Sequence, residues 1–339
     1  MAAPGRVFAI NLLANSKPAE NAFKNVGKAA GRLPGPVGIA TAAIRASFVA
    51  VVAVVGKVGK ELLELGEMFN DSFRTIRVGT GQTGDAFAEL QDSFRAVAQN
   101  VPNDMGDVAT AIAEVNTRTG ATGDQLETLA EQFLTVSRLL GGDVQSNVRA
   151  VTRLFGDFGV EAEDQADLMN VLFRASQMSG AAFDTLANQT VQYGASLRNL
   201  GFTLPESIAL LASFEKNGTN LETVMSGLRT AQAKLAESGK PLSEALADVI
   251  RDIQGAETAA EGTTLAMEIF GRRSGPDLYD AIQSGRLGVD ELVAAILNGS
   301  DTIDAAADDT DGFREAWEEF KNYIKITLEP AATEVFGTL

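Results

Sequence analysis

The sequence predicts an all-α protein, and three observations support this fold class. Apolar residues recur at helical spacing along most of the chain, and Gly-containing breaks separate these stretches. No useful length of sequence alternates apolar and polar residues as a half-buried strand would. We expect an irregular multi-helix domain of short antiparallel helices, with an apolar helix before it and a long helix after it.

Residues 1–36 are expected to form an N-terminal segment that ends in a linker. Its short apolar run, from Arg6 to Ala14, does not distinguish a strand from a helical turn. A candidate helix from Ala19 to Gly31 follows it. The sequence Leu33-Pro34-Gly35-Pro36 then breaks the chain, because Pro and Gly disfavour regular structure.

Residues 37–78 are expected to form one helix that is apolar first and amphipathic later. From Ile39 to Val55 the only charge is Arg45, and the helix should continue through Lys57 toward Arg77. The apolar part is about one bilayer crossing long, but a charge near the bilayer centre is costly. Bundling is therefore favoured over membrane insertion, and both interpretations stay open. The side chains that would serve either role are Ile39, Phe48, Val51, Val52 and Val55.

Residues 79–309 are expected to form the helical core domain. Its breaks carry Asp, Thr or Asn, whose side-chain oxygens can accept hydrogen bonds from the free N–H groups of a first helical turn. Asp104 and Asp143 are examples, and Thr203 with Glu206 has the spacing of a capping box. Three apolar stripes illustrate the helices between the breaks: Leu126, Leu129, Phe133, Val136 and Leu140; Val148, Val151, Leu154, Phe155 and Phe158; and Leu204, Ile208, Leu211 and Phe214.

Residues 310–339 are expected to begin a long helical rod that leaves the core domain. An apolar stripe runs along this helix, with acids and lysines opposite, until Pro330 interrupts it. We interpret the stripe as a partner-facing surface. It consists of Phe313, Trp317, Phe320, Ile324 and Leu328.

Composition and charge argue against most enzyme classes and against nucleic-acid binding. The chain contains neither His nor Cys, which removes imidazole acid–base chemistry, thiol nucleophiles and thiolate metal sites. Its 28 basic and 45 acidic residues leave a net charge of -17, which repels phosphate backbones. We therefore expect no enzyme, no cofactor and no direct contact with DNA or RNA.

Two segments imitate ligand-binding motifs. Residues 271–275 are Gly-rich and basic, but a break between helices with Pro276 at the next helix start is the simpler interpretation. Residues 307–318 place carboxylates at several positions of a calcium loop. Ala307 stands where that loop needs Asp, and Arg314 where it needs an apolar residue. An acidic turn that caps the last helix is therefore favoured over a calcium site.

Several short motifs occur in an order and spacing that point to one family. They are residues 68–74 with the Gly-Thr-rich turn 79–84, residues 154–164, residues 200–211, the turn 217–219, residues 227–229 and residues 266–271. With them, the chain from about Glu67 to Leu339 resembles the core of tail tape measure proteins of long-tailed phages. Each motif is weak alone, and their order carries the resemblance.

The resemblance implies a structural scaffold that sets tail length and is not an enzyme. Such proteins lie inside the tail tube, assemble in the host cytoplasm, and leave the tube around DNA ejection. The implied partners are the tail tube protein, tail assembly chaperones, distal tail or baseplate proteins, and other copies of the chain in the tube lumen. Membrane contact would belong to ejection. The resemblance transfers no catalytic, cofactor or metal residue.

One departure from a ruler concerns length. At ~1.5 Å per helical residue the whole chain would span at most about 500 Å, and folded-back helices span far less. We therefore expect an N-terminal part of a longer protein or a truncated prophage copy, and we favour both over a ruler for a very short tail. The competing hypothesis from a different class is a membrane-active helical protein that inserts residues 39–55.

Overall fold

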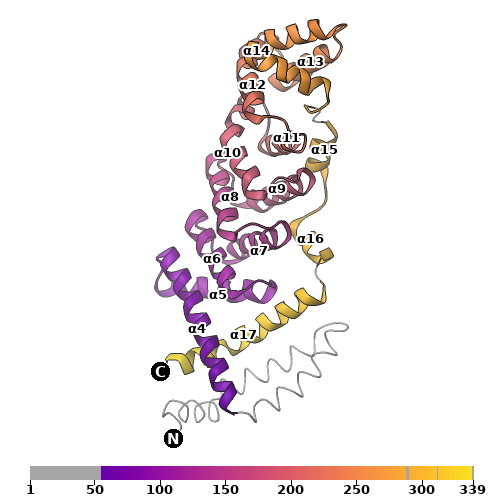
Figure 1. Ribbon diagram of the computed structural model, residues 1–339. Helices are drawn as coiled ribbons and strands as arrows, with labels where there is room; N and C mark the ends of the chain where they lie inside the picture. Colours follow the sequence, from indigo (N-terminus) through magenta and orange to yellow (C-terminus); the bar gives the residue numbers. More distant parts are fainter. Residues whose placement is uncertain (1–54, 288–289, 311, 338–339) are drawn as a thin grey trace. The chain divides into compact units, whose positions relative to one another are not determined.

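The computed structural model describes residues 55–287, 290–310 and 312–337, and these contain helices but no strand (Figure 1). The all-α prediction is confirmed. The predicted segment 1–36 and the side chains of Ile39, Phe48, Val51 and Val52 lie outside the described residues. Val55 is the first described residue of a helix, although its side chain is not described. No described helix has both the length and the apolar character needed to cross a membrane.

The chain divides into two compact units. Unit 1 comprises residues 1–135 and 307–339, and unit 2 comprises residues 136–306. The domain boundaries expected at 36, 78 and 309 stay predictions. The two units differ in continuity, because unit 1 is built from two separated stretches and unit 2 from one.

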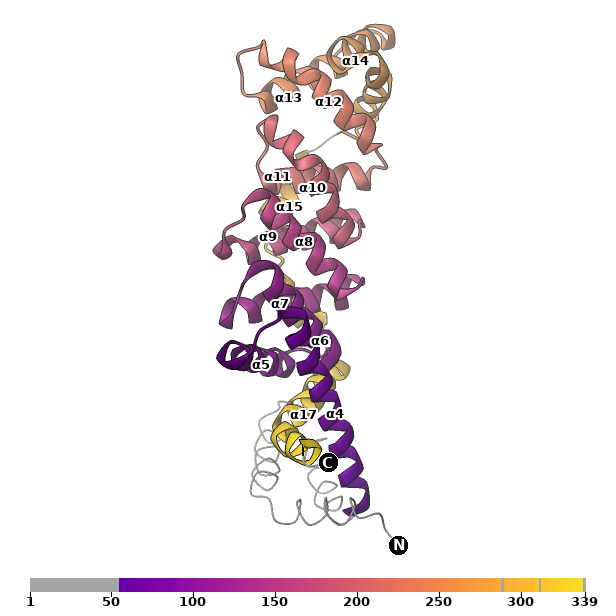
Figure 2. The same cartoon turned by 90° about the vertical axis from the view of Figure 1, so that its left-hand side faces the viewer.

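Unit 1 is a bundle in which the last helix packs on the first described ones. Both α4 and α5 contact α17, and α4 also contacts α6 along much of its length. Figures 1 and 2 show α17, in yellow, lying across α4, in indigo. The helices are α4 (Val55–Thr80), α5 (Gly84–Asn100), α6 (Met105–Thr119), most of α7 (Gly123–Leu140) and α17 (Phe313–Gly337).

An aromatic cluster forms part of the core of unit 1. Phe69 of α4 and Phe94 of α5 are fully buried, and their rings meet edge to face with centroids 6.3 Å apart. Phe73 contacts the same Phe94 ring at 5.6 Å. Edge-to-face pairs add to the area that aromatic side chains bury. This cluster therefore joins α4 to α5 on the side of unit 1 that also receives α17.

Unit 2 is a continuous series of short helices. Its α8 packs on α10, α9 on α11, and α12 on α14, while α13 packs on both α12 and α14. Figure 2 shows α12, α13 and α14 together at one end of this unit. The elements are α8 (Val144–Phe158), η1 (Ala162–Asp164), α9 (Gln165–Ser179), α10 (Phe183–Asn199), α11 (Leu204–Lys216), α12 (Leu221–Ala236), α13 (Leu242–Gln254), α14 (Ala259–Gln283), α15 (Asp290–Asn298) and the start of α16 (Ile303–Thr310).

The predicted helix starts occur where capping side chains stand. Asp104 accepts hydrogen bonds from two N–H groups of α6, and Asp143 accepts one from Ser146 of α8. Thr203 and Glu206 form both bonds of a capping box at α11. Thr83 precedes α5 as expected but makes no side-chain capping bond. The three confirmed caps orient the helices whose apolar faces form the core.

The apolar stripes identified in the sequence are largely the buried faces. In α7, Leu126, Leu129 and Phe133 are 0–1% exposed. In α11, Ile208 and Leu211 are fully buried. The last stripe residue of α7, Leu140, and that of α8, Phe158, are only half-buried. Helical periodicity therefore predicted the buried face of each helix, but the agreement with observed burial is poorer at the helix ends.

Two prolines lie inside helices, contrary to the sequence expectations. The break expected at residues 271–275 is a kink at Gly271, with φ +85° and ψ 158°, and Pro276 lies within the helix that follows. The prediction that Pro330 interrupts the last helix is wrong, since α17 continues to Gly337. Ala331 and Ala332 next to Pro330 are buried, and packing of this kind can offset the hydrogen bond that proline removes.

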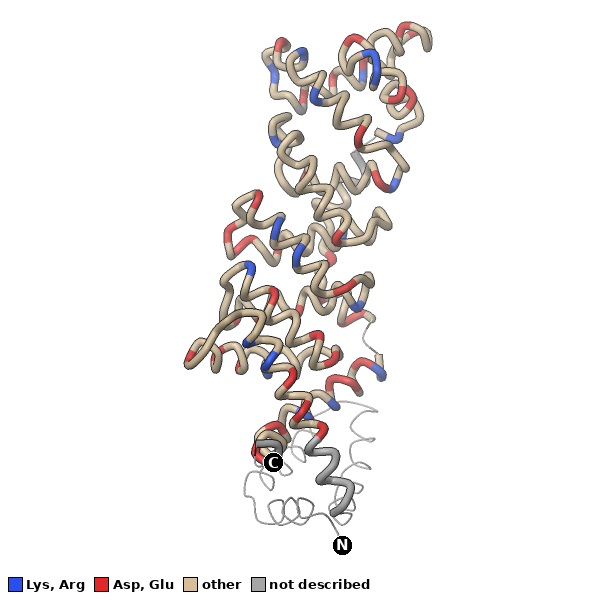
Figure 3. The backbone as a smooth tube through the Cα atoms, turned by 60° about the vertical axis from the view of Figure 1, so that its left-hand side comes forward, with Lys and Arg blue, Asp and Glu red and all other residues tan. Residues whose placement is uncertain are grey.

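Charged side chains are distributed over many helices. In Figure 3, Lys and Arg occur singly among more numerous Asp and Glu residues, without a continuous basic face on the described tube. Several ion pairs between exposed residues are local, such as Arg74 with Asp71 and Arg251 with Asp248. Exposed pairs of this kind contribute little stability, typically below ~1 kcal/mol.

Candidate functional site

The predicted partner-facing stripe lies on α17, within unit 1. Phe320 is 4% exposed, and Trp317, Ile324 and Leu328 are half-buried. The ring of Trp317 lies 5.6 Å from that of Phe320. The side chain of Phe313 is outside the described residues. Part of the stripe is thus used in packing on the same chain, and a role toward a partner stays a prediction.

A polar clamp holds α17 against α5. The Arg95 guanidinium on α5 donates to both carboxylate oxygens of Glu329 on α17, at 2.8 and 3.1 Å. The Glu329 side chain is 9% exposed and that of Arg95 is 29% exposed. Arg95 also pairs with Asp92 at 2.7 Å and lies over the Phe73 ring. A two-pronged bond between Arg and a carboxylate fixes orientation as well as distance.

Asn322 makes the second part of the clamp. Its side chain is 2% exposed, and its amide nitrogen donates to the carbonyls of Val101 and Asn103, at 3.1 and 2.7 Å. These carbonyls belong to the turn between α5 and α6, where helical bonding is interrupted. One buried amide therefore satisfies backbone groups that the turn leaves without partners.

Two side chains of the clamp region have shifted pKa values. Desolvation opposes the charge on Arg95, but hydrogen bonding and attraction from Glu329 outweigh it and raise the pKa of the guanidinium. Burial lowers the pKa of the Lys325 ammonium on α17, and the charge of Lys321 lowers it further. The carboxylate of the clamp thus stabilises the charge of Arg95, whereas burial and a second lysine destabilise the charge of Lys325.

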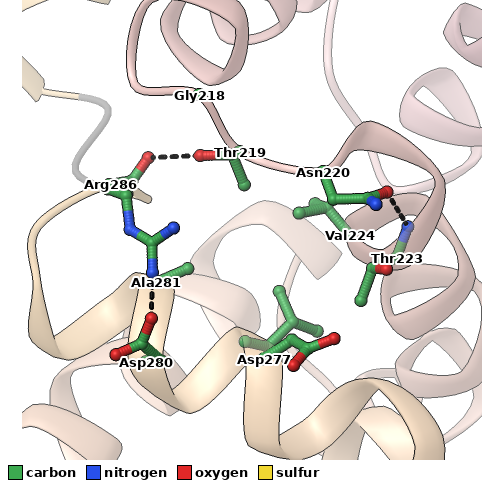
Figure 4. Close-up of a pocket in the computed structure, with 10 residues that line it drawn as sticks. Gly218, Thr219, Asn220, Thr223, Val224, Asp277, Asp280, Ala281 and Arg286 are labelled. Atoms are coloured by element: carbon green, nitrogen blue, oxygen red, sulfur yellow. Dashed lines mark hydrogen bonds and ion pairs between the residues drawn. The ribbon is translucent and has the colours of Figure 1, made fainter.

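A polar pocket of about 160 Å³ lies in unit 2 between α12 and α14. Its upper wall is the turn from Gly218 to Asn220, which joins α11 to α12. Thr219 donates to the carbonyl of Arg286 at 3.4 Å, and the guanidinium of Arg286 pairs with Asp280 (Figure 4). Asn220 caps α12 by accepting from the N–H of Thr223 at 3.0 Å. The pocket is therefore lined by groups that also brace the turn.

The chemistry of this pocket is limited. Figure 4 shows Asp277 at its edge, and both Asp277 and Asp280 are exposed. No group of three carboxylates in the described ranges could hold a metal ion. No nucleophile–base pair or enclosed carboxylate pair stands among the lining residues. The pocket supports a structural reading of the turn at residues 217–219 better than a catalytic one.

The segment that resembles a calcium loop comprises the end of α16 and the start of α17. The N–H of Gly312 donates to the Glu315 carboxylate at 3.1 Å, and Glu318 pairs with Lys321 at 2.6 Å. Residue 311 lies outside the described ranges. Glu318 is thus occupied by a neighbouring lysine, as the interpretation of an acidic turn before the last helix expects.

Sequence reasoning missed the residues that do most to position α17. Arg95 and Glu329 are 234 positions apart, and Asn322 is more than 200 positions from its carbonyl partners. The residues around Glu329 do not predict its burial, because an acidic side chain on a helix that also carries lysines is usually exposed to solvent. The one available hint was Asn322, a polar residue next to an apolar stripe.

Comparison with known families gives one match. The family model described as phage-related minor tail protein matches residues 91–285, which is more than half of the chain. The matched region runs from α5 to the turn after α14 and includes every residue that lines the pocket of Figure 4 except Arg286. No curated protein and no solved structure shows significant similarity to the chain.

Proposed function

The chain belongs to the family of phage-related minor tail proteins, and from this premise we propose that it is the tape measure of a long tail. In this role it is a scaffold on which tail tube subunits polymerise, and its extent sets the length of the tube. The observation that carries the proposal is the family match, joined to a wholly helical described structure.

Charge and residue types support a structural role over catalysis. With a net charge of -17 the protein is repelled by DNA, which suits a protein that shares the tube lumen with a genome and must leave it. Because the chain contains neither His nor Cys, Asp, Glu and Lys are the principal side chains that could serve in acid–base catalysis. In the described ranges they pair on surfaces or brace helices rather than converge in a cleft.

The proposed partners follow from this role. The tail tube protein would surround the chain, other copies would lie beside it, and tail assembly chaperones would hold it in the host cytoplasm before assembly. Distal tail or baseplate proteins would contact one end. A membrane-inserting role for residues 39–55 is the alternative proposal, and liposome flotation of wild type against Val52→Asp tests it.

The presence of the protein in virions is the first test. Purified tails should contain the chain, and phage that lacks it should form tube of uncontrolled length or none. Absence of the protein from purified tails would contradict the structural role itself.

The ruler role needs a separate test of length. An in-frame helical insertion of 25 residues after Glu334 should lengthen the tail by roughly 37 Å if each residue adds about 1.5 Å. The matched control places 25 Gly/Ser residues in the exposed turn at Gly239, which adds mass without adding rod. Equal tail lengths in electron micrographs of both variants would reject the ruler and leave the family assignment intact.

A further inference from the structure

The helix α17 carries its apolar stripe on the face opposite the polar clamp. Asn322, Ile326 and Glu329 are 2–7% exposed, and the first and last of these bind the α5–α6 turn and α5. With about 3.6 residues per helical turn, Phe320 and Ile324 each lie about 160° around the helix from Asn322. The clamp therefore does not cover the stripe.

Several large side chains of the stripe are only partly covered. Ile324 and Leu328 are half-buried, and so is Trp317, whose ring lies 5.6 Å from that of the buried Phe320. Removal of apolar surface from water is favourable, so a further apolar element that packs here would be stabilised. The stripe extends over about four helical turns of α17, which is long enough to receive a helix rather than one side chain.

The position of α4 decides which part of the chain can reach the stripe. Helix α4 contacts α17. Figures 1 and 2 show α17 beside the half of α4 that begins at Val55, with the C-terminus close to α4. The residues before Val55 are therefore joined to a helix that packs on α17. A segment attached in this way has a high effective concentration at the stripe, typically in the millimolar range, with which a second copy or a membrane would have to compete.

The chain that precedes α4 matches the stripe in length and in charge. Residues 39–54 and residues 313–328 would each extend about 22 Å as helices, at ~1.5 Å per residue. Residues 39–54 carry Arg45 as their only charge, whereas α17 has three Glu residues between positions 315 and 319. The first 54 residues hold six basic side chains and one acidic side chain, in a chain of net charge -17. The segment and the stripe are therefore both apolar and complementary in charge.

We propose that residues 39–54 pack along the apolar stripe of α17 in the same chain. Because α17 reaches α4 with its C-terminal end (Figure 1), the two elements run antiparallel, with Val51 near Ile324 or Leu328. Docking covers the partly exposed stripe and removes an apolar segment from water at the same time. The proposal is independent of the ruler role, since it concerns a contact within one chain.

Trp317 is the only tryptophan of the chain, so its fluorescence reports on the cover over the stripe. Val52→Asp places a charge in the segment and should release it, because a buried unpaired charge is unfavourable. The emission of the full chain should then shift to longer wavelength, and acrylamide should quench it more strongly. Val78→Asp makes the same change at a position of α4 that is 77% exposed, and it should leave both signals unchanged. Emission and quenching of Val52→Asp equal to those of the wild type would overturn the proposal.

Disulfide formation tests the contact directly, because the chain has no cysteine of its own. The full chain with Val51→Cys and either Ile324→Cys or Leu328→Cys should form an internal disulfide at least about 10-fold faster than a control pair. The control combines Val51→Cys with Val78→Cys, which lies about 35 Å from Val55 along α4 at ~1.5 Å per residue. The proposal fails if neither stripe pair is faster than the control. It also fails if the disulfides join two chains, since a second copy would then occupy the stripe.

Vesicle flotation separates docking on α17 from insertion into a membrane. Wild-type protein mixed with vesicles of phosphatidylcholine and phosphatidylglycerol should stay in the soluble fraction, because the stripe covers the apolar segment. Flotation of the wild type that is lost in Val52→Asp would assign residues 39–54 to the membrane and overturn the proposal. None of these measurements uses assembled tails, so their results are distinguishable from those of the ruler test.

Discussion

The docking of α17 in unit 1 and the contact between α12 and α14 in unit 2 join helices in opposite ways. α17 is held by long polar side chains, Arg95 to Glu329 and Asn322 to two carbonyls, from residues far apart in the sequence. The α12–α14 contact depends on a missing side chain, since a Cβ at Gly227 of α12 would meet the Leu278, Ser274 and Phe270 side chains of α14. Within α14, Gly275 likewise allows its backbone to approach that of Met267. The first contact depends on specific polar partners, whereas the second depends on close packing, in which added volume must displace neighbouring side chains.

The largest expected effect is at Gly275. A Cβ there would lie 2.5 Å from the Met267 Cα and 2.6 Å from its nitrogen, and backbone atoms cannot rotate away. Gly275→Ala should lower the free energy of unfolding by about 3 kcal/mol, measured by urea denaturation. Gly156→Ala is the matched control, because nothing lies within 4 Å of its Cβ. A neutral Gly275→Ala would mean that the two halves of α14 are less tightly packed than described.

Asn322 should give the next largest effect. Asn322→Ala leaves two carbonyls of the α5–α6 turn without their donor in a buried place, at a cost of about 2 kcal/mol. Hydrogen exchange should also quicken in α17 before it does in α6. Asn100→Ala, which removes an exposed bond to Glu131, should change little. Uniform exchange throughout unit 1 would argue that α17 does not detach separately.

Glu329→Gln should have a smaller effect, of about 1–2 kcal/mol. The substitution keeps the shape but removes the negative charge that pairs with Arg95, while Arg95 retains Asp92. Unfolding of the two proteins at low and high salt measures the loss. Asp92→Asn is the control, and its exposed pair should contribute less than ~0.5 kcal/mol. If Asp92→Asn costs as much as Glu329→Gln, the clamp is not the source of the stability.

The smallest effect is expected at a purely local feature. Thr203→Ala removes one half of the capping box of α11 and should cost about 1 kcal/mol. Thr203→Ser keeps the hydroxyl and should retain most of the stability. Thermal unfolding followed by circular dichroism compares the two, and a Ser variant as weak as the Ala variant would locate the loss in packing of the Thr methyl group.

The sequence predicted what depends on neighbours along the chain and missed what depends on distant ones. Periodicity identified Phe133 and Ile208 as buried, and local cap chemistry identified the starts of α6, α8 and α11. Both signals act within a few residues. The Arg95–Glu329 pair and the approach of Gly227 to Leu278 are set by tertiary packing, which one sequence does not encode locally.

The outcome at Pro330 shows that tertiary packing can also overturn a prediction made from a local rule. Pro330 has an unfavourable helical preference of about 3 kcal/mol, and a local rule ends the helix there. Burial of Ala331 and Ala332 accompanies continuation of α17 instead. The glycine-rich segment at residues 271–275 predicts a break between helices, and the structure has a kink at Gly271, whose φ of +85° with extended ψ is a conformation that essentially only glycine adopts. Packing can override the poor helical preference of proline. At Gly271, by contrast, residues other than glycine would be strained by the backbone angles.

Unit 1 is interrupted by the whole of unit 2, and this has a consequence for synthesis. Residues 136–306 are contiguous, so unit 2 can fold on the ribosome as soon as it emerges. α4 and α5 cannot receive α17 until residues 313–337 have been translated. Closing so long a loop costs little extra entropy, about 0.6 kcal/mol per doubling of its length. Packing of α17 therefore completes the bundle of unit 1 only after its other described helices have been translated.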